Sequence, residues 1–295
     1  MQKKGKKNLR SLLSPQIATV IAALIIIVAA VAVKGILYPS DKKEDGDKTA
    51  VSQDVTEKTK KHKHTKETET ETEREIEPEP TTELSDDDKV VYLTFDDGPS
   101  SNTTRILDAL DASGAKATFF VVHSYDGCEK QIKDIYDRGN KVGLHTYSHL
   151  YKIYQSEEAY FDDLKKISDL VYSATGYRSD ILRFPGGSSN TVSKKYNIGI
   201  MTRLTKAVTE KGYAYFDWDW DSRDVANAKD VASITRYATR AIGNDNHVIL
   251  LMHDAPLQKN TATAIPDIIK AYRDAGYRFD VLSKNSYTVH HTIGN

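Results

Sequence analysis

Residues 90–99 read VVYLTFDDGP, a run of β-branched and aromatic residues that ends in two carboxylates and a Gly-Pro turn. A strand buried on both faces of a parallel sheet has such a near-continuous apolar run, whereas a strand with one solvated face alternates. The run therefore predicts a central strand over Val90–Phe95. Asp96 and Asp97 follow it directly, and adjacent carboxylates repel each other unless a cation or an arginine compensates them.

Short runs rich in β-branched and aromatic residues recur along the rest of the chain. Further candidate strands are Lys116–Val122, Lys141–His145, Ile181–Phe184, Ala214–Trp220, Val248–Met252 and Tyr277–Leu282. Between them, apolar residues recur at helical spacing, as in the stripes Tyr160, Leu164, Ile167, Val171 and Ile265, Ile268, Ile269, Tyr272. Regular alternation of strands and helices indicates parallel strands joined by crossover helices. We predict an α/β fold over residues 89–295, a distorted (β/α)7 barrel.

The beginning of the chain has the composition of a membrane anchor. Residues 1–16 are basic and contain no acidic residue, and residues 17–38 are almost wholly apolar and carry no charge apart from Lys34. A bilayer span needs about 20 such residues, and basic residues before it place the N-terminus in the cytoplasm. A cleaved signal peptide is the alternative, since Ala30-Val31-Ala32 resembles a cleavage site. The apolar run is longer than the usual signal core of about 7–15 residues, which favours an uncleaved transmembrane helix.

Residues 39–88 have the composition of a disordered linker. They contain no Phe, Trp or Tyr and are crowded with Lys, Glu, Thr and Asp. Such a segment cannot bury enough apolar surface to offset its ordering entropy. His62 and His64 stand between lysines, which repel a cation, so a solvated spacer is favoured there over a metal site. The linker would hold the domain at 89–295 outside the cell, tethered to the membrane.

Charge and cysteine content exclude other classes. The net charge of the 295 residues is -1, which argues against a nucleic-acid surface. Cys128 is the only cysteine, so the chain forms no internal disulfide, and we interpret Cys128 as a core residue. We expect a monomer that does not bind nucleic acid.

Ligand-type and ionisable residues gather at the predicted ends of the strands. In α/β barrels the carboxyl ends of the strands carry the catalytic groups. Reading only those ends yields Asp96, Asp97, His145, His149, Arg183, Asp219, Asp221 and His253. Each residue by itself is a weak signal, but their coincidence at five of the predicted strand ends points to one site.

Part of this set has the chemistry of a metal centre. His145 and His149 are four residues apart, a spacing that brings two imidazoles to one side of a helical turn. One carboxylate of the aspartate pair would complete three protein ligands and leave positions open for water and substrate, as in catalytic zinc sites. Spacing alone does not say which aspartate is the ligand. Zinc suits such a set, and cobalt, nickel or manganese also bind nitrogen and oxygen ligands.

The remaining groups are suited to moving protons. The second aspartate could act as general base, with Arg183 pairing with it and orienting it. His253 could act as general acid, and a carboxylate such as Asp221 would raise its pKa. Asp219 and Asp224 remain alternatives for that carboxylate. The chain has no Gly-x-Ser-x-Gly elbow, which argues against a serine nucleophile.

These residues resemble the polysaccharide deacetylase family, the fourth family of carbohydrate esterases. Its motifs appear here in the family's order, as TFDDGP at 94–99, HTYSH at 145–149, RFPGG at 183–187, WDWDS at 218–222 and LMH at 251–253. The resemblance covers residues 89–283. Two departures are Leu150, where the family often has proline, and Val225, where its fourth motif often ends in tryptophan. Neither position is a ligand, so they would affect the shape of the glycan groove.

The resemblance implies a role for each site residue. Asp96 would be the base, and Asp97 would bind the metal together with His145 and His149. The backbone N–H of Gly186 would help to bind the oxyanion, while Leu251 and Trp218 would line the pocket for the acetyl methyl group.

The expected function is metal-dependent N-deacetylation of N-acetylglucosamine residues in an extracellular glycan. Peptidoglycan is the preferred substrate, because the domain is expected to be tethered outside a membrane. Chitin-type oligosaccharides and acetyl esters of xylan are alternatives of the same class. A catalytically silent glycan-binding module is the alternative from another class, but such modules usually lack a ligand or a base and none is missing here.

Overall fold

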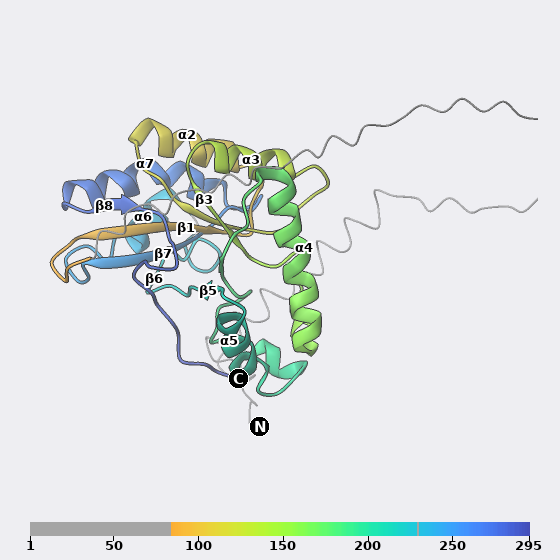
Figure 1. The fold of residues 1–295 in the computed structure, drawn as a ribbon. Coiled ribbons are helices and arrows are strands. Elements are labelled where there is room, and N and C mark those ends of the chain that lie inside the picture. The colour runs from red at the N-terminus through yellow and green to blue at the C-terminus, as the bar shows by residue number, and fades with distance from the viewer. Residues whose placement is uncertain (1–83, 229) are drawn as a thin grey trace, which may run out of the picture. The chain divides into compact units, whose positions relative to one another are not determined.

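Parallel strands and helices alternate along the folded part of the chain, as Figure 1 shows. The computed structural model describes residues 84–228 and 230–295, which fall within one compact unit, Glu79–Asn295. The predicted anchor at 17–38 and almost all of the predicted linker at 39–88 lie outside the described residues. Within those two ranges, no helix has both the length and the apolar character that crossing a bilayer requires.

The element bounds agree with the predicted alternation of strands and helices. The strands are β1 (Val90–Asp96), β2 (Thr118–Val121), β3 (Lys141–Leu144), β4 (Ile181–Leu182), β5 (Ala214–Tyr215), β6 (Trp220–Asp221), β7 (His247–His253) and β8 (Arg278–Asp280). The helices are α2 (Thr103–Ser113), α3 (Glu129–Asp137), α4 (Glu157–Thr175), α5 (Ile200–Glu210), α6 (Val231–Ala238) and α7 (Lys259–Asp274), with 3-10 turns η2 (Tyr151–Gln155) and η3 (Val192–Lys195).

The strands form one curled sheet in the order β5-β4-β3-β2-β1-β7-β6, and β8 adds to the first residues of β1. Every pairing is parallel. Among the described residues, β5 and β6 do not pair with each other, so the sheet curls without closing. This arrangement fits the predicted distorted barrel.

The single strand predicted over Ala214–Trp220 is wrong, because the chain leaves the sheet between β5 and β6. There the Asp217 amide donates to the Val289 carbonyl instead of to a neighbouring strand. The C-terminal segment at 283–295 continues along this gap, where His291 N donates to Asp217 Oδ2 at 2.8 Å. A buried carboxylate and a distant segment therefore interrupt what reads in the sequence as one β-rich run.

Alternation along β1 separates two apolar clusters, because successive side chains point to opposite faces of a strand. Val91, Leu93 and Phe95 join the main core between sheet and helices. Val90 and Tyr92 join a smaller cluster of buried side chains that also contains Phe120, Ile181, Phe216, Ile249 and Leu282. By the same alternation, Asp96 points to the face of this smaller cluster. The strand thus delivers a carboxylate to the inner face of the sheet.

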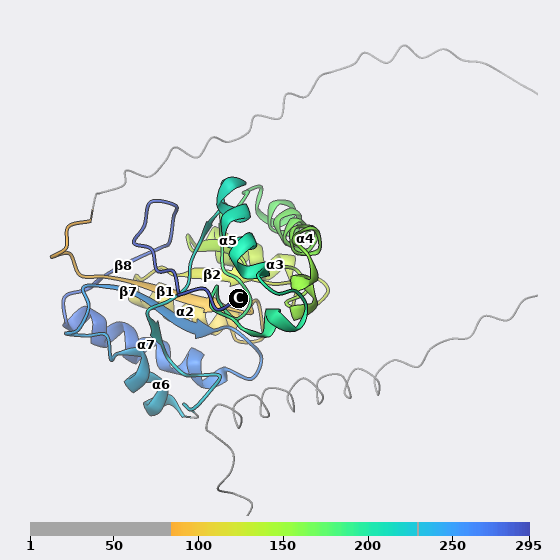
Figure 2. The same ribbon diagram turned by 90° about the horizontal axis from the view of Figure 1, so that it is seen from below.

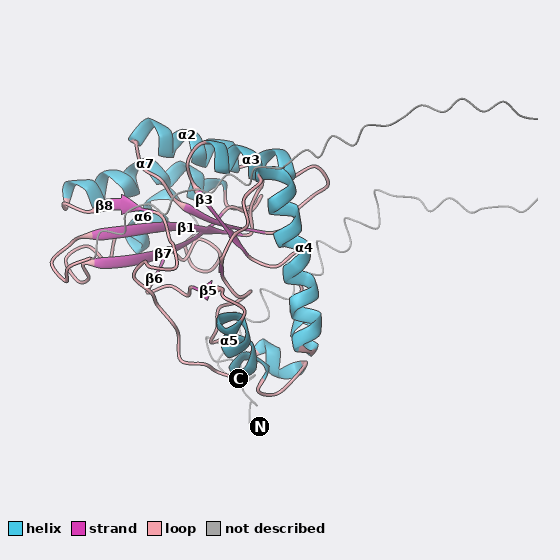
Figure 3. Ribbon diagram, in the orientation of Figure 1, coloured by secondary structure: helices cyan, strands magenta, loops and turns pink. Residues whose placement is uncertain are grey.

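Helices cover the outer face of the sheet, with α2 packed on α7, α3 on α4 and α6 on α7 (Figures 2 and 3). The two predicted stripes are buried on α4 and α7, as expected. The Ser156 hydroxyl caps α4 by accepting a hydrogen bond from the Ala159 amide. At its other end Gly176 has φ 71°, a left-handed conformation that glycine adopts without a steric penalty.

Candidate active site

The carboxyl ends of β1, β3, β4 and β7 bring the predicted site residues together. Asp96 is the last residue of β1, and Asp97 follows it with φ 70°. A left-handed backbone is unfavourable for an aspartate and persists only where the surrounding structure fixes it, often at functional sites. The turn directs the two adjacent carboxylates to different partners, Asp96 to Arg183 and Asp97 to the two histidines.

Asp97, His145 and His149 form a cluster with the donors of a metal site. Their ligand atoms all lie within 4.8 Å of one another. Asp97 Oδ1 is 3.6 Å from His145 Nε2 and 3.2 Å from His149 Nε2. The same oxygen is buried and has no hydrogen-bond partner among the described residues. Buried polar atoms rarely lack a partner, and one carboxylate with two imidazoles fits a divalent cation of the zinc type.

The surroundings of His145 favour the form that binds a metal. Its Nδ1 lies 2.7 Å from the Arg183 carbonyl, to which it donates, so Nε2 carries the free lone pair toward Asp97. A backbone partner of this kind fixes the ring of many metal-ligating histidines. Burial, and then the neighbouring His149, lower the pKa of His145 to about 3. The imidazole is therefore neutral at physiological pH.

The predicted helical turn between the two histidines is wrong. Residues 145–149 form a loop, in which Thr146 has φ 66° and His149 has φ 53°. Asp163 of α4 holds this loop, since its Oδ1 accepts the Tyr147 amide at 2.7 Å and the Ser148 amide at 2.9 Å. Sequence reasoning missed Asp163. Its signal is a carboxylate three residues after Tyr160, within the apolar stripe of an amphipathic helix.

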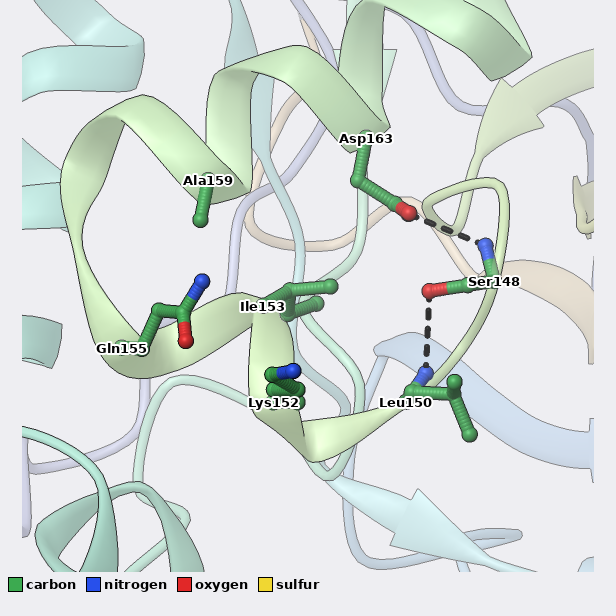
Figure 4. Close-up of a pocket in the computed structure, with 7 residues that line it drawn as sticks. All are labelled: Ser148, Leu150, Lys152, Ile153, Gln155, Ala159 and Asp163. Carbon is green, nitrogen blue, oxygen red and sulfur yellow. Dashed lines mark hydrogen bonds between the residues drawn. The ribbon is translucent and has the colours of Figure 1, made fainter.

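A shallow hollow of about 260 Å³ lies beside this loop. Figure 4 shows its lining, which consists of Ser148, Leu150, Lys152, Ile153, Gln155, Ala159 and Asp163. Its wall includes Ser148 and Asp163, which holds the loop, and Leu150, one of the two departures from the family pattern. Leu150 is largely exposed there.

Asp96 is paired with Arg183, as predicted. Arg183 Nη1 donates to Asp96 Oδ1 at 2.9 Å and to Thr94 Oγ1 at 2.8 Å. Its other nitrogens donate to the carbonyls of Phe216 and Asp217, both at 3.0 Å. The guanidinium is fully buried and its hydrogen bonds join β1 to the segment that follows β5, so it fixes the orientation of the Asp96 carboxylate. Asp96 Oδ2 faces His145 Nε2 at 3.7 Å.

Asp217 is a second residue that sequence reasoning missed. It is buried, and its carboxylate accepts the Ser188 amide at 2.8 Å and the Ser188 hydroxyl, in addition to His291 N. Its carbonyl accepts from Arg183, so it links the loop after β4 and the C-terminal segment to the arginine that orients Asp96. It falls within the predicted strand Ala214–Trp220, so the sequence pattern does not mark it as a site residue.

His253 is paired with Asp224, and the choice of Asp221 as its partner is wrong. Asp224 Oδ1 lies 2.9 Å from His253 Nδ1, and its Oδ2 accepts the His253 amide at 2.9 Å. Arg223, with φ 61°, turns the chain after β6 and brings Asp224 back to β7. Burial alone lowers the pKa of His253, but the Asp224 charge and hydrogen bond, with Asp97 and Asp96, outweigh it and raise the pKa to about 10.

The two other candidate carboxylates have structural partners. Asp221 Oδ1 accepts the Arg223 amide at 2.7 Å and makes no hydrogen bond to His253 among the described residues. Asp219 Oδ1 accepts the Ile249 amide at 2.8 Å, and burial raises the pKa of Asp219 to about 6. Both carboxylates thus stabilise the edge of the sheet near β6 and β7.

The residues assigned to the acetyl pocket lie around the same site. Gly186 has φ 78°, and a Cβ there would lie 2.5 Å from the Tyr151 hydroxyl, so only glycine fits. Trp218 packs beside the next residue, since a Cβ on Gly187 would meet its ring at 3.1 Å. Leu251 is buried in β7, two residues before His253. The structure brings these three residues to the end of the sheet that carries Asp96 and His253.

Asp254 supports the loop after β1 and was also missed. Its carboxylate accepts the hydroxyls of Ser100 at 2.7 Å and Thr103 at 2.6 Å. A Cβ on Gly98 would lie 2.5 Å from Asp254 Oδ2, so the glycine permits this approach. Burial raises the pKa of Asp254. The signal was its place directly after the predicted acid, His253.

Comparison with known proteins gives a consistent result. Residues 83–199 match the sequence model of the family described as polysaccharide deacetylase. A peptidoglycan-N-acetylglucosamine deacetylase of Bacillus cereus is 30% identical over 213 residues, which cover 68% of this chain and 71% of the relative.

Two solved structures show the same fold. The catalytic domain of peptidoglycan N-acetylglucosamine deacetylase from Eubacterium rectale is 38% identical, with a TM-score of 0.69 over 72% of this chain and 96% of that domain. A family 4 carbohydrate esterase from Streptomyces lividans, in complex with acetate, is 29% identical, with a TM-score of 0.57 over 68% of this chain and 97% of the other. With its motifs, its curled sheet and these relatives in agreement, the chain belongs to the polysaccharide deacetylase family and is a hydrolytic deacetylase.

Proposed function

We propose that this protein hydrolyses the N-acetyl amide of N-acetylglucosamine residues in peptidoglycan and releases acetate and a free amine. The observation that carries the proposal is the convergence of three units at one edge of the sheet. These are the Asp96–Arg183 pair, the His253–Asp224 pair and the cluster of Asp97, His145 and His149. The relatives from Bacillus cereus and Eubacterium rectale bear the name of this activity, which supports the choice of substrate.

Asp96 is the general base in this proposal. Arg183 occupies its Oδ1, which leaves Oδ2 to remove the proton from the attacking water. Because the arginine is fully buried and held by two carbonyls, the carboxylate keeps its direction during the reaction. General-base catalysis depends on this positioning as well as on basicity.

His253 is the general acid. Asp224 binds its Nδ1, so Nε2 is the nitrogen that carries the transferable proton. With a pKa raised to about 10, the imidazole holds this proton at neutral pH. It delivers the proton to the leaving nitrogen as the carbon–nitrogen bond breaks, and the amine departs neutral.

Asp97, His145 and His149 would hold a divalent cation, most simply Zn²⁺, with Co²⁺, Ni²⁺ and Mn²⁺ as alternatives. A cation bound there supplies Lewis acidity, which polarises the acyl oxygen and acidifies the attacking water. The Gly186 amide would donate to the same oxygen as charge develops on it. Leu251 and Trp218 would receive the acetyl methyl group.

We further propose that the domain acts outside the cell as a monomer anchored by a single transmembrane helix at 17–38. The basic residues at 1–16 and the apolar run after them support this orientation. Peptidoglycan lies on that side of the membrane, within reach of a domain that follows the predicted linker at 39–88.

An acetate-release assay tests the proposed function. The full-length protein with Zn²⁺ is offered peptidoglycan, a chitin oligosaccharide and acetylated xylan in parallel. We expect acetate from peptidoglycan at the highest kcat/KM, together with new free amines on its glucosamine residues. Preference for the chitin oligosaccharide or xylan would overturn the choice of substrate. Glycan retention without acetate from any of the three would favour a silent binding module.

Removing the metal should abolish activity and leave the fold intact. The apolar core of the domain does not depend on the Asp97 cluster, so the apo-protein should keep its circular dichroism spectrum and a cooperative thermal transition. Dialysis against a chelator, followed by titration with Zn²⁺, measures both effects. Global unfolding of the chelated protein would instead assign the cluster a structural role.

A further inference from the structure

The Tyr151 hydroxyl occupies a position that no role assigned so far explains. Tyr151 begins η2, directly after the histidine loop, and its hydroxyl lies where a side chain on Gly186 would begin, 2.5 Å from the ideal Cβ position. The hydroxyl therefore rests against the α-carbon of the glycine whose amide is assigned to the oxyanion. Asp97 is near enough for its charge to act on the phenol. The hydroxyl thus lies beside Gly186 and within range of the Asp97 charge.

The hydroxyl is available as a donor. Among the residues that the structure describes, it makes no hydrogen bond, although the ring is half-buried. A half-buried phenol that makes no hydrogen bond within the protein is suited to donate one to a ligand.

The ring is held rigidly relative to Gly186. It packs against Tyr154, with ring centroids 6.0 Å apart, and the main core lies behind both rings. The Tyr154 hydroxyl in turn donates to the Pro185 carbonyl at 2.9 Å, one residue before Gly186. η2 and the oxyanion loop are therefore tied together, which fixes the direction of the Tyr151 hydroxyl in advance of binding.

We propose that the Tyr151 hydroxyl is a second donor to the acyl oxygen of the substrate, beside the Gly186 amide. This inference rests on the proposed deacetylation. An oxygen that gains charge in the transition state is stabilised most by donors that are already in place, and the fixed ring holds the Tyr151 oxygen in place before the substrate binds. Glycine at position 186 then permits the left-handed backbone of the loop and also leaves room for the Tyr151 hydroxyl, which any side chain there would displace.

Tyr151→Phe in the full-length, Zn²⁺-loaded protein tests the inference, with peptidoglycan as substrate. Loss of one oxyanion donor lowers kcat by about 10²-fold or more. We expect such a fall in kcat with little change in KM, metal content or Tm, because the ring and its packing are retained. Tyr172→Phe, which removes a hydroxyl from an exposed ring of α4, is the matched control and should behave like the parent.

A double-mutant cycle with Gly186→Ala locates the hydroxyl. The new methyl group would collide with it in the parent, whereas without the hydroxyl the nearest ring atom of Tyr151 is 3.4 Å away. Gly186→Ala should therefore lower kcat by a smaller factor in the Tyr151→Phe background than in the parent. Independent, multiplicative losses would contradict the assignment.

Three results would overturn the inference in different ways. If Tyr151→Phe turns over at the parental rate, the hydroxyl is not a donor to the acyl oxygen and the proposed function is untouched. If its lower rate is accompanied by a lower Tm or by lost metal, Tyr151 has only a structural role. If the parent itself releases no acetate, the proposed function fails and this inference fails with it.

Discussion

Asp96→Asn is expected to lower kcat by about 10²–10⁴-fold, the usual contribution of a general base, while the protein keeps its metal and its Tm. Asparagine has the shape of aspartate, and its side-chain oxygen can still accept the hydrogen bond from Arg183. It cannot take a proton from water. Steady-state acetate release, metal analysis and thermal unfolding of the same preparation separate these effects.

Asp97→Asn is the matched comparison, one residue along the chain. Asp97 Oδ1 faces both imidazoles, so loss of the negative charge should weaken metal binding first. Activity should recover in part when the metal concentration is raised. If Asp96→Asn loses its metal and Asp97→Asn retains it, the two roles are reversed. If both variants release acetate like the parent, the site lies elsewhere.

His253→Asn should lower kcat by a similar factor of about 10²–10⁴, because the leaving amine loses its proton donor. Metal content should not change, since His253 is outside the cluster of Asp97, His145 and His149. The pH profile of kcat/KM adds a more specific readout. The parent should lose activity as the pH rises through the pKa of His253, and the His253→Asn profile should lack that basic limb.

Asp224→Asn should move the basic limb to lower pH. Asp224 supplies the charge and the hydrogen bond that raise the pKa of His253 to about 10 against the effect of burial. With the carboxylate gone, burial dominates, the pKa falls, and the acid is deprotonated at a lower pH. Asp221→Asn is the control, because Asp221 makes no hydrogen bond to His253 among the described residues, and its limb should move much less. A larger shift from Asp221→Asn would restore the original choice of partner.

The parts of the fold that could be predicted from sequence are those with long or periodic patterns. β1 and β7 are continuous apolar runs, and the stripes on α4 and α7 repeat over several turns, so neighbouring residues determine them. β4, β5 and β6 contain two residues each, and pairing with distant strands determines where they begin and end. For this reason the sequence pattern predicts one strand over Ala214–Trp220, where the structure has two.

The site residues also separate into those that local sequence patterns predict and those that distant contacts determine. Asp96, Asp97, His145 and His253 could be predicted as neighbours, because the carboxyl ends of parallel strands meet at one edge of a sheet. The partner of His253 could not, since it depends on one left-handed residue, Arg223, that no local pattern marks. Asp163, Asp217 and Asp254 act through contacts with segments that are distant in sequence.

The membrane anchor, the linker and the location of the domain remain predictions. They rest on the composition of residues 1–88, almost all of which lie outside the described part of the chain. Fractionation of cells, followed by protease treatment of intact cells, would test all three.

Asp96 and His253 are directly opposite each other in the register of β1 and β7. Neighbouring strands are about 4.8 Å apart, and backbone hydrogen bonds maintain that spacing. The backbone separation of the proposed base, Asp96, and the proposed acid, His253, is thus set by the sheet. The loops around the site can therefore change in length and sequence while the backbone spacing of Asp96 and His253 stays the same. Such a scaffold allows substrate preference to change through the loops while the residues at the strand ends are retained.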